Sequence, residues 1–265
     1  MGERQEEEGS MLKVGSRVLV TAGASGIGLV IAETFVKNKA RVYACDISDS
    51  SLQEATSRFP QVAFVRADVA DVKQVDQVFD QIEDKFGGLD VLINNAGIAG
   101  PTAAVEKITP EQWSRTIAVN LNGQFHCLRR AVPLLKAAGG GSIINISSVA
   151  GRLGYPLRAP YAASKWAIVG LSNSLAMELG PHGIRVNALL PGMVAGDRMR
   201  HVIEAKAAAT GQSFEQVEKE LLERISIRTY TEASDIANMA LFLCSQEGCR
   251  VSGQAISVCG NTEVL

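Results

Sequence analysis

Hydrophobic residues occur along the chain in short, nearly continuous runs, and most runs are separated by segments long enough to form a helix. Near-continuous apolar runs are typical of strands that are covered on both faces. Strands that alternate with helices predict repeated βαβ units with right-handed crossovers. We therefore expect an α/β fold, a doubly wound sheet of about seven parallel strands with helices on both faces. The candidate strands are residues 17–21, 40–46, 62–68, 91–95, 142–147, 184–190 and 255–259.

The domain organisation is inferred from the absence of repeats and linkers in the sequence. No fixed-period repeat and no linker rich in Pro or Ser divides the chain, so residues 15–265 are expected to form one domain. Residues 1–14 contain the acidic run 6–8, which predicts a disordered leader or, alternatively, an acidic interaction tail. No apolar stretch of signal-peptide or membrane-spanning length is evident there.

Residues 194–228 form the one long excursion from the strand and helix alternation. The pattern predicts two helices, the first ending at Gly211 and the second starting at Ser213, with Gln216 completing a capping box. An excursion of this length is usually a lid or a decoration. Its origin just after a strand favours a substrate lid.

Composition and charge argue against several classes of function. The 265 residues carry a formal net charge of −2, which gives no electrostatic footprint for nucleic acid or an anionic membrane. The five cysteines form no CxxC pair, which favours a reducing compartment, and the cytoplasm is expected. His126 and His201 lack a ligand set around them, so no metal site is predicted.

A glycine-containing turn, "TAGASGIG" at residues 21–28, follows the first strand and precedes a helical segment. Such a turn places backbone N–H groups and a helix N-terminus against a diphosphate. Gly26 and Gly28 would permit close approach, and Ser25 and Ile27 would offer N–H groups or a hydroxyl. The spacing is not GxGxxG, and glycines also serve ordinary tight turns.

Two acidic residues end the next two strands. Asp46 ends the second strand, where a carboxylate can bind the adenosine ribose and repel a 2′-phosphate, which favours NAD over NADP. Asp68 ends the third, where it and Val69 could flank the adenine. The alternative for Asp46 is an acidic turn residue. The carboxyl ends of the first three strands would then meet at one crevice, which is where open α/β sheets bind ligands.

The run "YAASK" places Tyr161 and Lys165 four residues apart, on one face of a predicted helix. A phenol has an ordinary pKa of about 10, and a neighbouring ammonium favours its phenolate. The pair can therefore act as an acid or base near neutral pH. The alternative is a surface aromatic beside a solvated lysine.

Taken together and in order, the motifs resemble the short-chain dehydrogenases/reductases over residues 15–260. They are "TAGASGIG", "NNAG" (94–97), Asn120, "ISS" (146–148), "YAASK" (161–165) and "PGMV" (191–194). The resemblance implies a Rossmann-type sheet, a nicotinamide cofactor, hydride exchange with a secondary alcohol or ketone, and frequently a homotetramer.

The resemblance also implies roles for individual residues. Tyr161 would be the acid/base, and Lys165 its partner and a ligand of the nicotinamide ribose. Ser148 would bind the substrate oxygen, and Asn120 would complete the tetrad by holding a water. Further cofactor contacts are implied at Gly23, Asn95, Ala96, Gly97, Pro191, Gly192 and Val194.

The sequence departs from the family pattern at three places. Ala22 follows Thr21 where a glycine is usual, so this alanine must adopt the backbone angles of the corner. Ala195 and Gly196 stand where a threonine commonly contacts the nicotinamide amide. Cys259 replaces a common aspartate near the end of the chain.

The expected substrate side of the cleft contains several cationic and apolar side chains. Arg152, Arg158 and Arg198 could bind an anionic group, or they could face solvent or pair with glutamates. Tyr155 and Met199 could line an apolar wall.

The leading interpretation is an NAD-dependent oxidoreductase acting on a small secondary alcohol, such as a sugar, polyol or hydroxy acid. Two alternatives stay open: a 3-oxoacyl-thioester reductase, and a catalytically idle regulatory protein that binds NAD.

Overall fold

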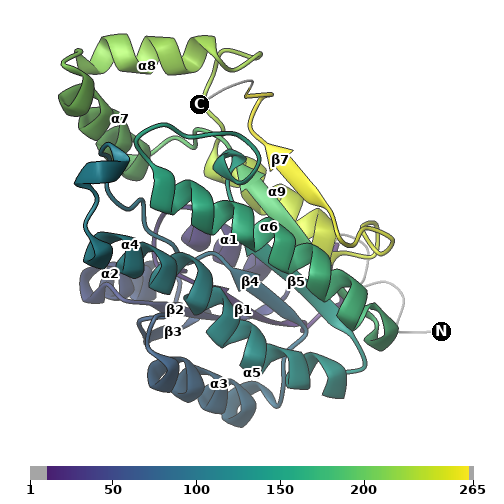
Figure 1. Cartoon of the computed structure of the whole chain (residues 1–265). Helices are drawn as coiled ribbons and strands as arrows, with labels where there is room; N and C mark the ends of the chain where they lie inside the picture. Colours follow the sequence, from purple (N-terminus) through teal and green to yellow (C-terminus); the bar gives the residue numbers. More distant parts are fainter. Residues whose placement is uncertain (1–10, 263–265) are drawn as a thin grey trace.

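The seven strands form one parallel sheet in the order β3-β2-β1-β4-β5-β6-β7, as the computed structural model of residues 11–262 shows (Figure 1). Each neighbouring pair is parallel, which confirms the predicted doubly wound topology. The strands are β1 (Arg17–Thr21), β2 (Arg41–Asp46), β3 (Ala63–Arg66), β4 (Val91–Asn94), β5 (Gly141–Ile146), β6 (Ile184–Pro191) and β7 (Ala255–Val258). Every predicted strand is therefore present, with ends that shift by at most two residues.

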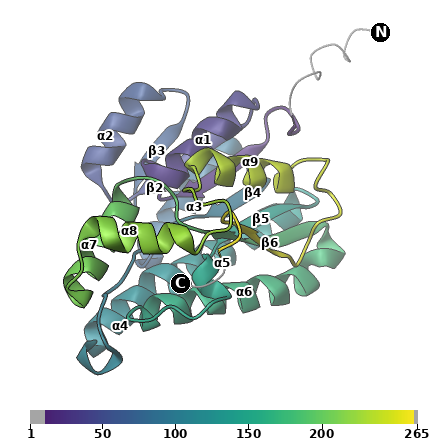
Figure 2. The same cartoon turned by 90° about the horizontal axis from the view of Figure 1, so that it is seen from above.

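Helices connect the strands and cover both faces of the sheet (Figure 2). They are α1 (Gly26–Lys37), α2 (Asp49–Arg58), α3 (Val72–Phe86), α4 (Pro110–Ile117), α5 (Gly123–Ala137), α6 (Ala159–Leu179), α7 (Asp197–Thr210), α8 (Phe214–Glu223) and α9 (Ala233–Cys244). A π-helical turn, η2 (Ala118–Asn122), joins α4 to α5, and a 3₁₀ turn, η3 (Val149–Gly151), follows β5. Within residues 11–262, no helix is long and apolar enough to cross a bilayer.

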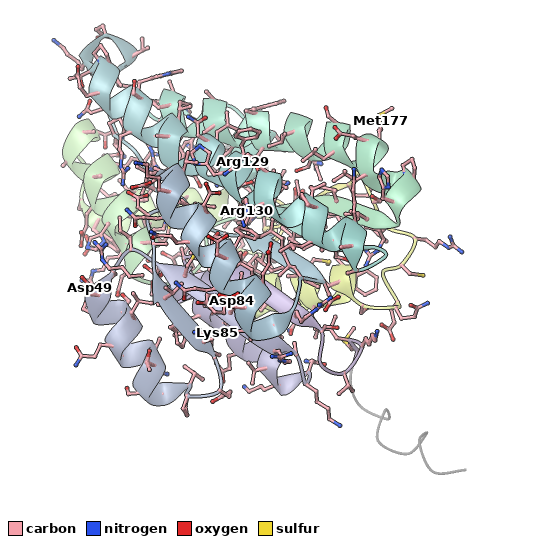
Figure 3. All side chains as sticks on the ribbon, turned by 90° about the horizontal axis from the view of Figure 1, so that it is seen from below. Asp49, Asp84, Lys85, Arg129, Arg130 and Met177 are labelled. Carbon is pink, nitrogen blue, oxygen red and sulfur yellow. The ribbon has the colours of Figure 1, made fainter. Side chains whose placement is uncertain are left out.

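Two apolar cores lie on opposite faces of the sheet because neighbouring strand residues point to opposite sides. Leu19 and Leu92 pack with α3, α5 and α6, whereas Val20 and Ile93 pack with α1 and α9. Arg130 on α5, labelled in Figure 3, lies on the first face, where it bonds Asp80 on α3 at 2.8 Å. Both faces are covered, which explains why the strands read as continuous apolar runs.

The excursion at 194–228, called the lid below, forms α7 and α8 as predicted. Gly211 ends α7 with φ +71°, and Ser213 and Gln216 form the expected capping box at the start of α8. The two helices share a small apolar cluster that is separate from both sheet cores. Its buried members are Met193, Ile203, Ala207, Val217, Leu221 and Ile225.

The structure changes one expected boundary at the amino-terminal end. Residues 1–10 of the predicted leader lie outside the described residues, but residues 11–14 do not. Leu12 is buried against the core that contains Phe35, and the N–H of Met11 donates to Asn38 Oδ1 at 3.3 Å. The packed part therefore begins before residue 15, because Leu12 covers apolar surface beside α1.

Candidate active site

The candidate site lies where the winding of the sheet reverses. From β1 the chain adds β2 and β3 on one side, and then β4 to β7 on the other. At this reversal the loops after β1 and β4 diverge and leave a crevice at the carboxyl ends of the strands. The glycine-containing turn follows β1, and the "NNAG" loop follows β4, so both reach this crevice.

The hydroxyl of Thr21 ties these two loops together. It accepts the N–H groups of Asn95 and Ala96, both at 2.9 Å. The Asn95 amide donates in return to the carbonyls of Thr21 and Ala22, at 3.0 and 3.1 Å. Gly23 joins the turn to β2 by donating its N–H to a β2 carbonyl at 3.0 Å. Sequence reasoning did not assign Thr21 this role; its signal is a hydroxyl at the end of β1.

The turn has the shape that a dinucleotide diphosphate requires. A Cβ on Gly28 would lie 2.0 Å from the carbonyl oxygen of Ala22, so only glycine lets α1 approach β1 this closely. Gly26 has φ +51° and faces open space, and α1 begins there after Ser25. The first N–H groups of α1, Ile27 included, have no partner within the helix and can face an anion. These residues fit a nicotinamide dinucleotide.

The backbone at Ala22 is strained, as expected for an alanine at a position where the family usually has glycine. Its φ is +49°, in the left-handed region that a Cβ disfavours. Non-glycine residues are held there only where the surroundings determine the backbone. The bond from Asn95 to the Ala22 carbonyl is one such restraint.

Asp46 lies at the end of β2 and is 6% exposed. Its Oδ2 accepts the N–H of Ala24 in the turn at 3.2 Å, and its Oδ1 accepts the N–H of Ser48 at 3.1 Å. The carboxylate thus shapes the turn as well as placing a negative charge beside it. Both interpretations of Asp46, as a turn residue and as a ribose ligand, are compatible with this geometry.

Asp68 and Val69 follow β3 at the same edge of the sheet. Asp68 Oδ1 accepts the N–H of Ala70 at 2.9 Å, and Oδ2 pairs with Arg115 at 3.0 Å. Val69 is buried with its side chain against Gly123, where an added Cβ would come within 2.7 Å of it. Asp68 therefore has a cationic partner from α4, which the sequence did not indicate.

The strand β6 ends at Pro191, and the following residues start the lid. Gly192 packs so tightly on Cys259 that an added Cβ would lie 2.6 Å from the cysteine Cβ. Val194 forms a parallel bridge with Thr231, which anchors the start of the lid. The small Cys259 side chain thus serves packing at the end of β7.

Helix α6 brings Tyr161 and Lys165 together, one turn apart. Lys165 Nζ lies 5.6 Å from the centroid of the Tyr161 ring and donates to the carbonyl of Ile146 at 2.9 Å. A Cβ on Gly97 would come within 3.5 Å of this ammonium, so the "NNAG" loop closes directly over it. The Ser148 hydroxyl approaches Tyr161 from the end of β5.

Asn120 is fully buried in the π-helical turn η2 and holds the loop after β4. Its Oδ1 accepts the N–H of Ile98 at 2.7 Å, and its Nδ2 donates to the Ile98 carbonyl at 3.1 Å and to Ser164 Oγ at 3.1 Å. Ser164 Oγ donates to the carbonyl of Tyr161 at 2.7 Å. The Asn120 side chain is therefore linked to the backbone of Tyr161 through Ser164.

Ser147 was not expected to contribute, yet it positions the lysine. Its hydroxyl donates to the carbonyl of Lys165 at 2.7 Å. Gly151 allows this contact, because a Cβ there would lie 2.5 Å from Ser147 Oγ. The only sequence signal was the first serine of the "SS" pair.

The cluster is electrostatically unusual. Burial opposes ionisation of Tyr161, but Lys165, Arg198, the Ser148 hydroxyl and Arg158 outweigh it and lower the pKa of the phenol. Burial also lowers the pKa of Lys165 to about 8, although Tyr161 partly offsets this. A phenol that ionises more easily than usual is suited to proton transfer near neutral pH.

The candidate substrate residues separate into different environments. Arg152 is exposed and donates to the Ala255 carbonyl on β7 at 2.7 Å, which occupies it away from Tyr161. Arg158 is buried, and Arg198 is exposed at the start of the lid. The ring of Tyr155 meets that of Tyr161 edge to face, at 6.3 Å between centroids. Met199 packs against the lid cluster.

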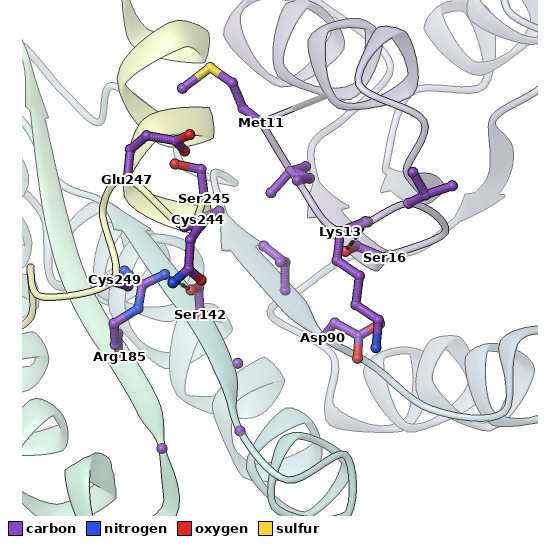
Figure 4. Close-up of a pocket in the computed structure, with 17 residues that line it drawn as sticks. Met11, Lys13, Ser16, Asp90, Ser142, Arg185, Cys244, Ser245, Glu247 and Cys249 are labelled. Carbon is purple, nitrogen blue, oxygen red and sulfur yellow. Dashed lines mark hydrogen bonds between the residues drawn. The ribbon is translucent and has the colours of Figure 1, made fainter. Parts of the chain in front are cut away.

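A separate cavity of about 590 Å³ lies at the amino ends of the strands, away from this cluster (Figure 4). Arg185 enters it and donates to Ser142 Oγ at 2.7 Å and to the carbonyl of Gly248 at 3.0 Å. These bonds fix the segment after α9 to the sheet. The cavity contains none of the predicted site residues.

Comparisons with known proteins show which proteins this chain resembles. Residues 21–260 match a family model described as enoyl-(acyl carrier protein) reductase. An uncharacterized oxidoreductase of Thermotoga maritima is 35% identical, with 95% of this chain and 98% of that protein covered. A probable galactose dehydrogenase of Rhizobium meliloti is 36% identical, with 92% and 93% covered. A 3-oxoacyl-[acyl-carrier-protein] reductase of Staphylococcus aureus is 32% identical, with 94% and 98% covered.

Two solved structures share the fold over nearly their whole length. An actinorhodin polyketide ketoreductase with NADPH superimposes with a TM-score of 0.89 at 31% identity, covering 93% of this chain and 96% of the other. An NAD+-bound xylitol dehydrogenase gives 0.90 at 26% identity, covering 93% and 98%.

Proposed function

Because the chain belongs to the short-chain dehydrogenase/reductase family, we propose that it transfers hydride between NAD and a small secondary alcohol such as a sugar, polyol or hydroxy acid. It is an oxidoreductase of CH–OH groups that uses a nicotinamide cofactor. The observation that carries the proposal is the cluster of Tyr161, Lys165 and Ser148 at the carboxyl ends of the strands.

The proposed mechanism assigns one proton movement to the protein. The nicotinamide, when bound, supplies the hydride acceptor or donor. In alcohol oxidation the Tyr161 phenolate takes the hydroxyl proton, and in reduction the phenol returns it. Ser148 donates a hydrogen bond to the substrate oxygen and stabilises the charge that develops there. Lys165 favours the phenolate and would bind the nicotinamide ribose.

The preference for NAD over NADP rests on Asp46. Its carboxylate is held at the end of β2 by two backbone N–H groups, so it cannot readily turn away from the ribose position. A fixed negative charge there repels a 2′-phosphate. The solved relatives carry NADPH in one case and NAD+ in the other, so fold alone does not decide between the cofactors.

A reductase of 3-oxoacyl thioesters is the second candidate. It is favoured by the Staphylococcus aureus relative of that name and by the description of the matching family model. The Asp46 charge argues against it where such an enzyme uses NADPH. The intact set of Asn120, Ser148, Tyr161 and Lys165 argues against an idle, purely regulatory protein.

A substrate panel tests the proposal. Sugars, polyols, hydroxy acids and acyl thioesters would be supplied with each cofactor, and NADH or NADPH absorbance would be followed. We expect NAD+-dependent oxidation of at least one small secondary alcohol. Activity confined to acyl thioesters with NADPH would select the second candidate.

We also propose that the protein is a homotetramer. Large apolar side chains are exposed on α4, α5 and α6, which is unfavourable for a monomer. They are Trp113, Phe125, Trp166 and Met177. Light scattering would give the assembly size, and any mass other than that of four chains would contradict this proposal.

We place the protein in the cytoplasm. All five cysteines, at positions 45, 127, 244, 249 and 259, are free, which suits a reducing compartment. Fractionation of the native cells would test this.

A further inference from the structure

Arg158 is a buried cation beside the phenol, and the mechanism above does not use it. It is 3% exposed and lies at the start of α6, with its guanidinium carbon 5.1 Å from the Tyr155 ring centroid and 5.0 Å from that of Tyr161. Its Nη2 donates to the carbonyl of Ala99 at 2.7 Å. Its buried Nε finds no hydrogen-bond partner among the described residues.

No carboxylate compensates this buried charge within residues 11–262. The ion pairs of that region do not include Arg158. A buried cation is unfavourable unless an anion or a hydrogen-bond acceptor compensates it. Two phenols lie beside it, but burial raises the pKa of Tyr155, whereas the pKa of Tyr161 is lowered. The guanidinium therefore gains a counter-charge when Tyr161 ionises.

The backbone next to Arg158 is strained. Leu157 has φ +64°, which a branched side chain disfavours. Its carbonyl accepts the N–H of Ala103 at 2.9 Å, and the N–H of Arg158 donates to the Tyr155 carbonyl at 3.2 Å. Strain of this kind is found where a structure fixes a functional group.

We propose that Arg158 is a positioning residue for Tyr161, whose stacked, permanently charged guanidinium holds the phenol ring and favours its phenolate. This inference rests on the proposed role of Tyr161 in proton transfer. It assigns Arg158 to the acid/base group instead of to an anionic part of the substrate.

Other groups also face the phenol, from every element packed around it. They are Lys165 on α6, Ser148 after β5, Arg198 on the lid and the neutral ring of Tyr155. The nicotinamide of a bound oxidised cofactor would add a further positive charge.

Arg158 differs from the other two cations in this set. The buried Lys165 has its pKa lowered to about 8, so its charge weakens in alkaline solution. Arg198 is exposed, and water and salt screen its charge. An arginine stays protonated over the working range, and Arg158 is buried against the ring. It is therefore the cation whose effect on Tyr161 is insensitive to both pH and salt.

The test compares Arg158→Met, which removes the charge but keeps apolar bulk, with Arg158→Lys, which keeps a charge. Arg58→Gln is the matched control, because Arg58 is exposed at the end of α2 and pairs with Glu54 at 3.2 Å. The kcat/KM for NAD+-dependent oxidation of an alcohol from the panel would be measured across pH. Phenolate absorbance would be titrated in each variant with and without Tyr161→Phe, which isolates the Tyr161 signal.

In Arg158→Met we expect kcat/KM to fall roughly tenfold near neutral pH and to recover as the pH rises, because the phenolate then forms at higher pH. The Tyr161 absorbance titration should move in the same direction. Arg158→Lys should restore part of the wild-type profile, and Arg58→Gln should leave it unchanged.

Each contrary result has a distinct meaning. In one such result, Arg158→Met keeps the wild-type midpoint of its pH profile, with kcat/KM reduced by the same factor at every pH. That result would overturn the proposal and show that Arg158 has only a structural role. Failure of both Arg158 variants to fold would overturn it in the same way. Full turnover in Tyr161→Phe would refute the proposed function itself. An inactive Tyr161→Phe with an unshifted Arg158→Met would refute only this inference. If no alcohol in the panel is oxidised, the phenolate absorbance titration alone tests the proposal, and an unshifted Tyr161 titration in Arg158→Met would overturn it.

Discussion

The floor of the candidate site and the lid above it are built in contrasting ways. The floor, consisting of Asn120, Ser147, Ser164 and Lys165, is buried, and each side chain has a hydrogen bond to a defined partner. The lid contains α7 and α8, which carry a small apolar cluster of their own. The floor is thus fixed by hydrogen bonds, whereas the lid helices are held mainly by their own apolar cluster.

The connections of the lid support this division. One side of it is fixed by the bridge between Val194 and Thr231, and the other by the bridge between Ile225 and Thr262. Between them, Gly196 has φ +132° at the start of α7 and faces open space. Substitutions in the floor should therefore affect turnover, and those in the lid should affect substrate binding or stability.

The largest expected effect is that of Tyr161→Phe. Removing the hydroxyl should lower kcat by about a thousandfold, the usual contribution of a positioned acid or base, while NADH binding persists. The control is Tyr43→Phe, which removes a hydroxyl on β2 that bonds Gln81 on α3 at 2.6 Å. Similar turnover in the two variants would refute the acid/base role of Tyr161.

Lys165 provides a test through protein stability. Its folded pKa of about 8 lies below the ordinary 10.5, so between these values the unfolded chain binds more protons. Stability should therefore rise with pH across this window, by on the order of 2 kcal/mol. Urea unfolding of the cofactor-free protein would show this rise in the wild type and a smaller one in Lys165→Met. Parallel pH dependence in both proteins would contradict the burial argument.

Asn120→Ala tests the floor itself. It would remove the two hydrogen bonds to the N–H and carbonyl of Ile98 and the one to the Ser164 hydroxyl, at a cost of about 2 kcal/mol in unfolding free energy. Turnover should fall as well, because Ser164 bonds the carbonyl of Tyr161. Thermal unfolding and kcat would be measured together, and a variant with lower stability but unchanged kcat would separate Asn120 from the chemistry.

The strands could be predicted well from the sequence, because strands that are buried on both faces consist of nearly continuous apolar residues. The family resemblance likewise located Tyr161, Lys165 and Ser148, which the structure brings together, although their roles stay predictions. It did not reveal the contacts of Thr21 or Ser147.

Those contacts join residues far apart in the chain. Thr21 bonds a loop more than seventy residues away, and Ser147 bonds the carbonyl of Lys165. The environments of the arginines could not be predicted either. Arg152 and Arg158 are close in sequence, but Arg152 bonds a carbonyl of β7 and Arg158 bonds a carbonyl in the loop after β4. The direction in which a loop side chain points depends on tertiary packing, so it cannot be predicted from the local sequence pattern.

The smallest expected effect lies in the lid. Ser213→Ala removes the hydroxyl that accepts the N–H of Gln216 at 3.2 Å, and loss of such a cap costs about 1 kcal/mol. Because α8 packs on the lid cluster and not on the floor, kcat should stay unchanged. The measured change should be a lower protease resistance of the lid, with at most a higher KM. A fall in kcat comparable to that of Asn120→Ala would show that lid and floor act as one unit.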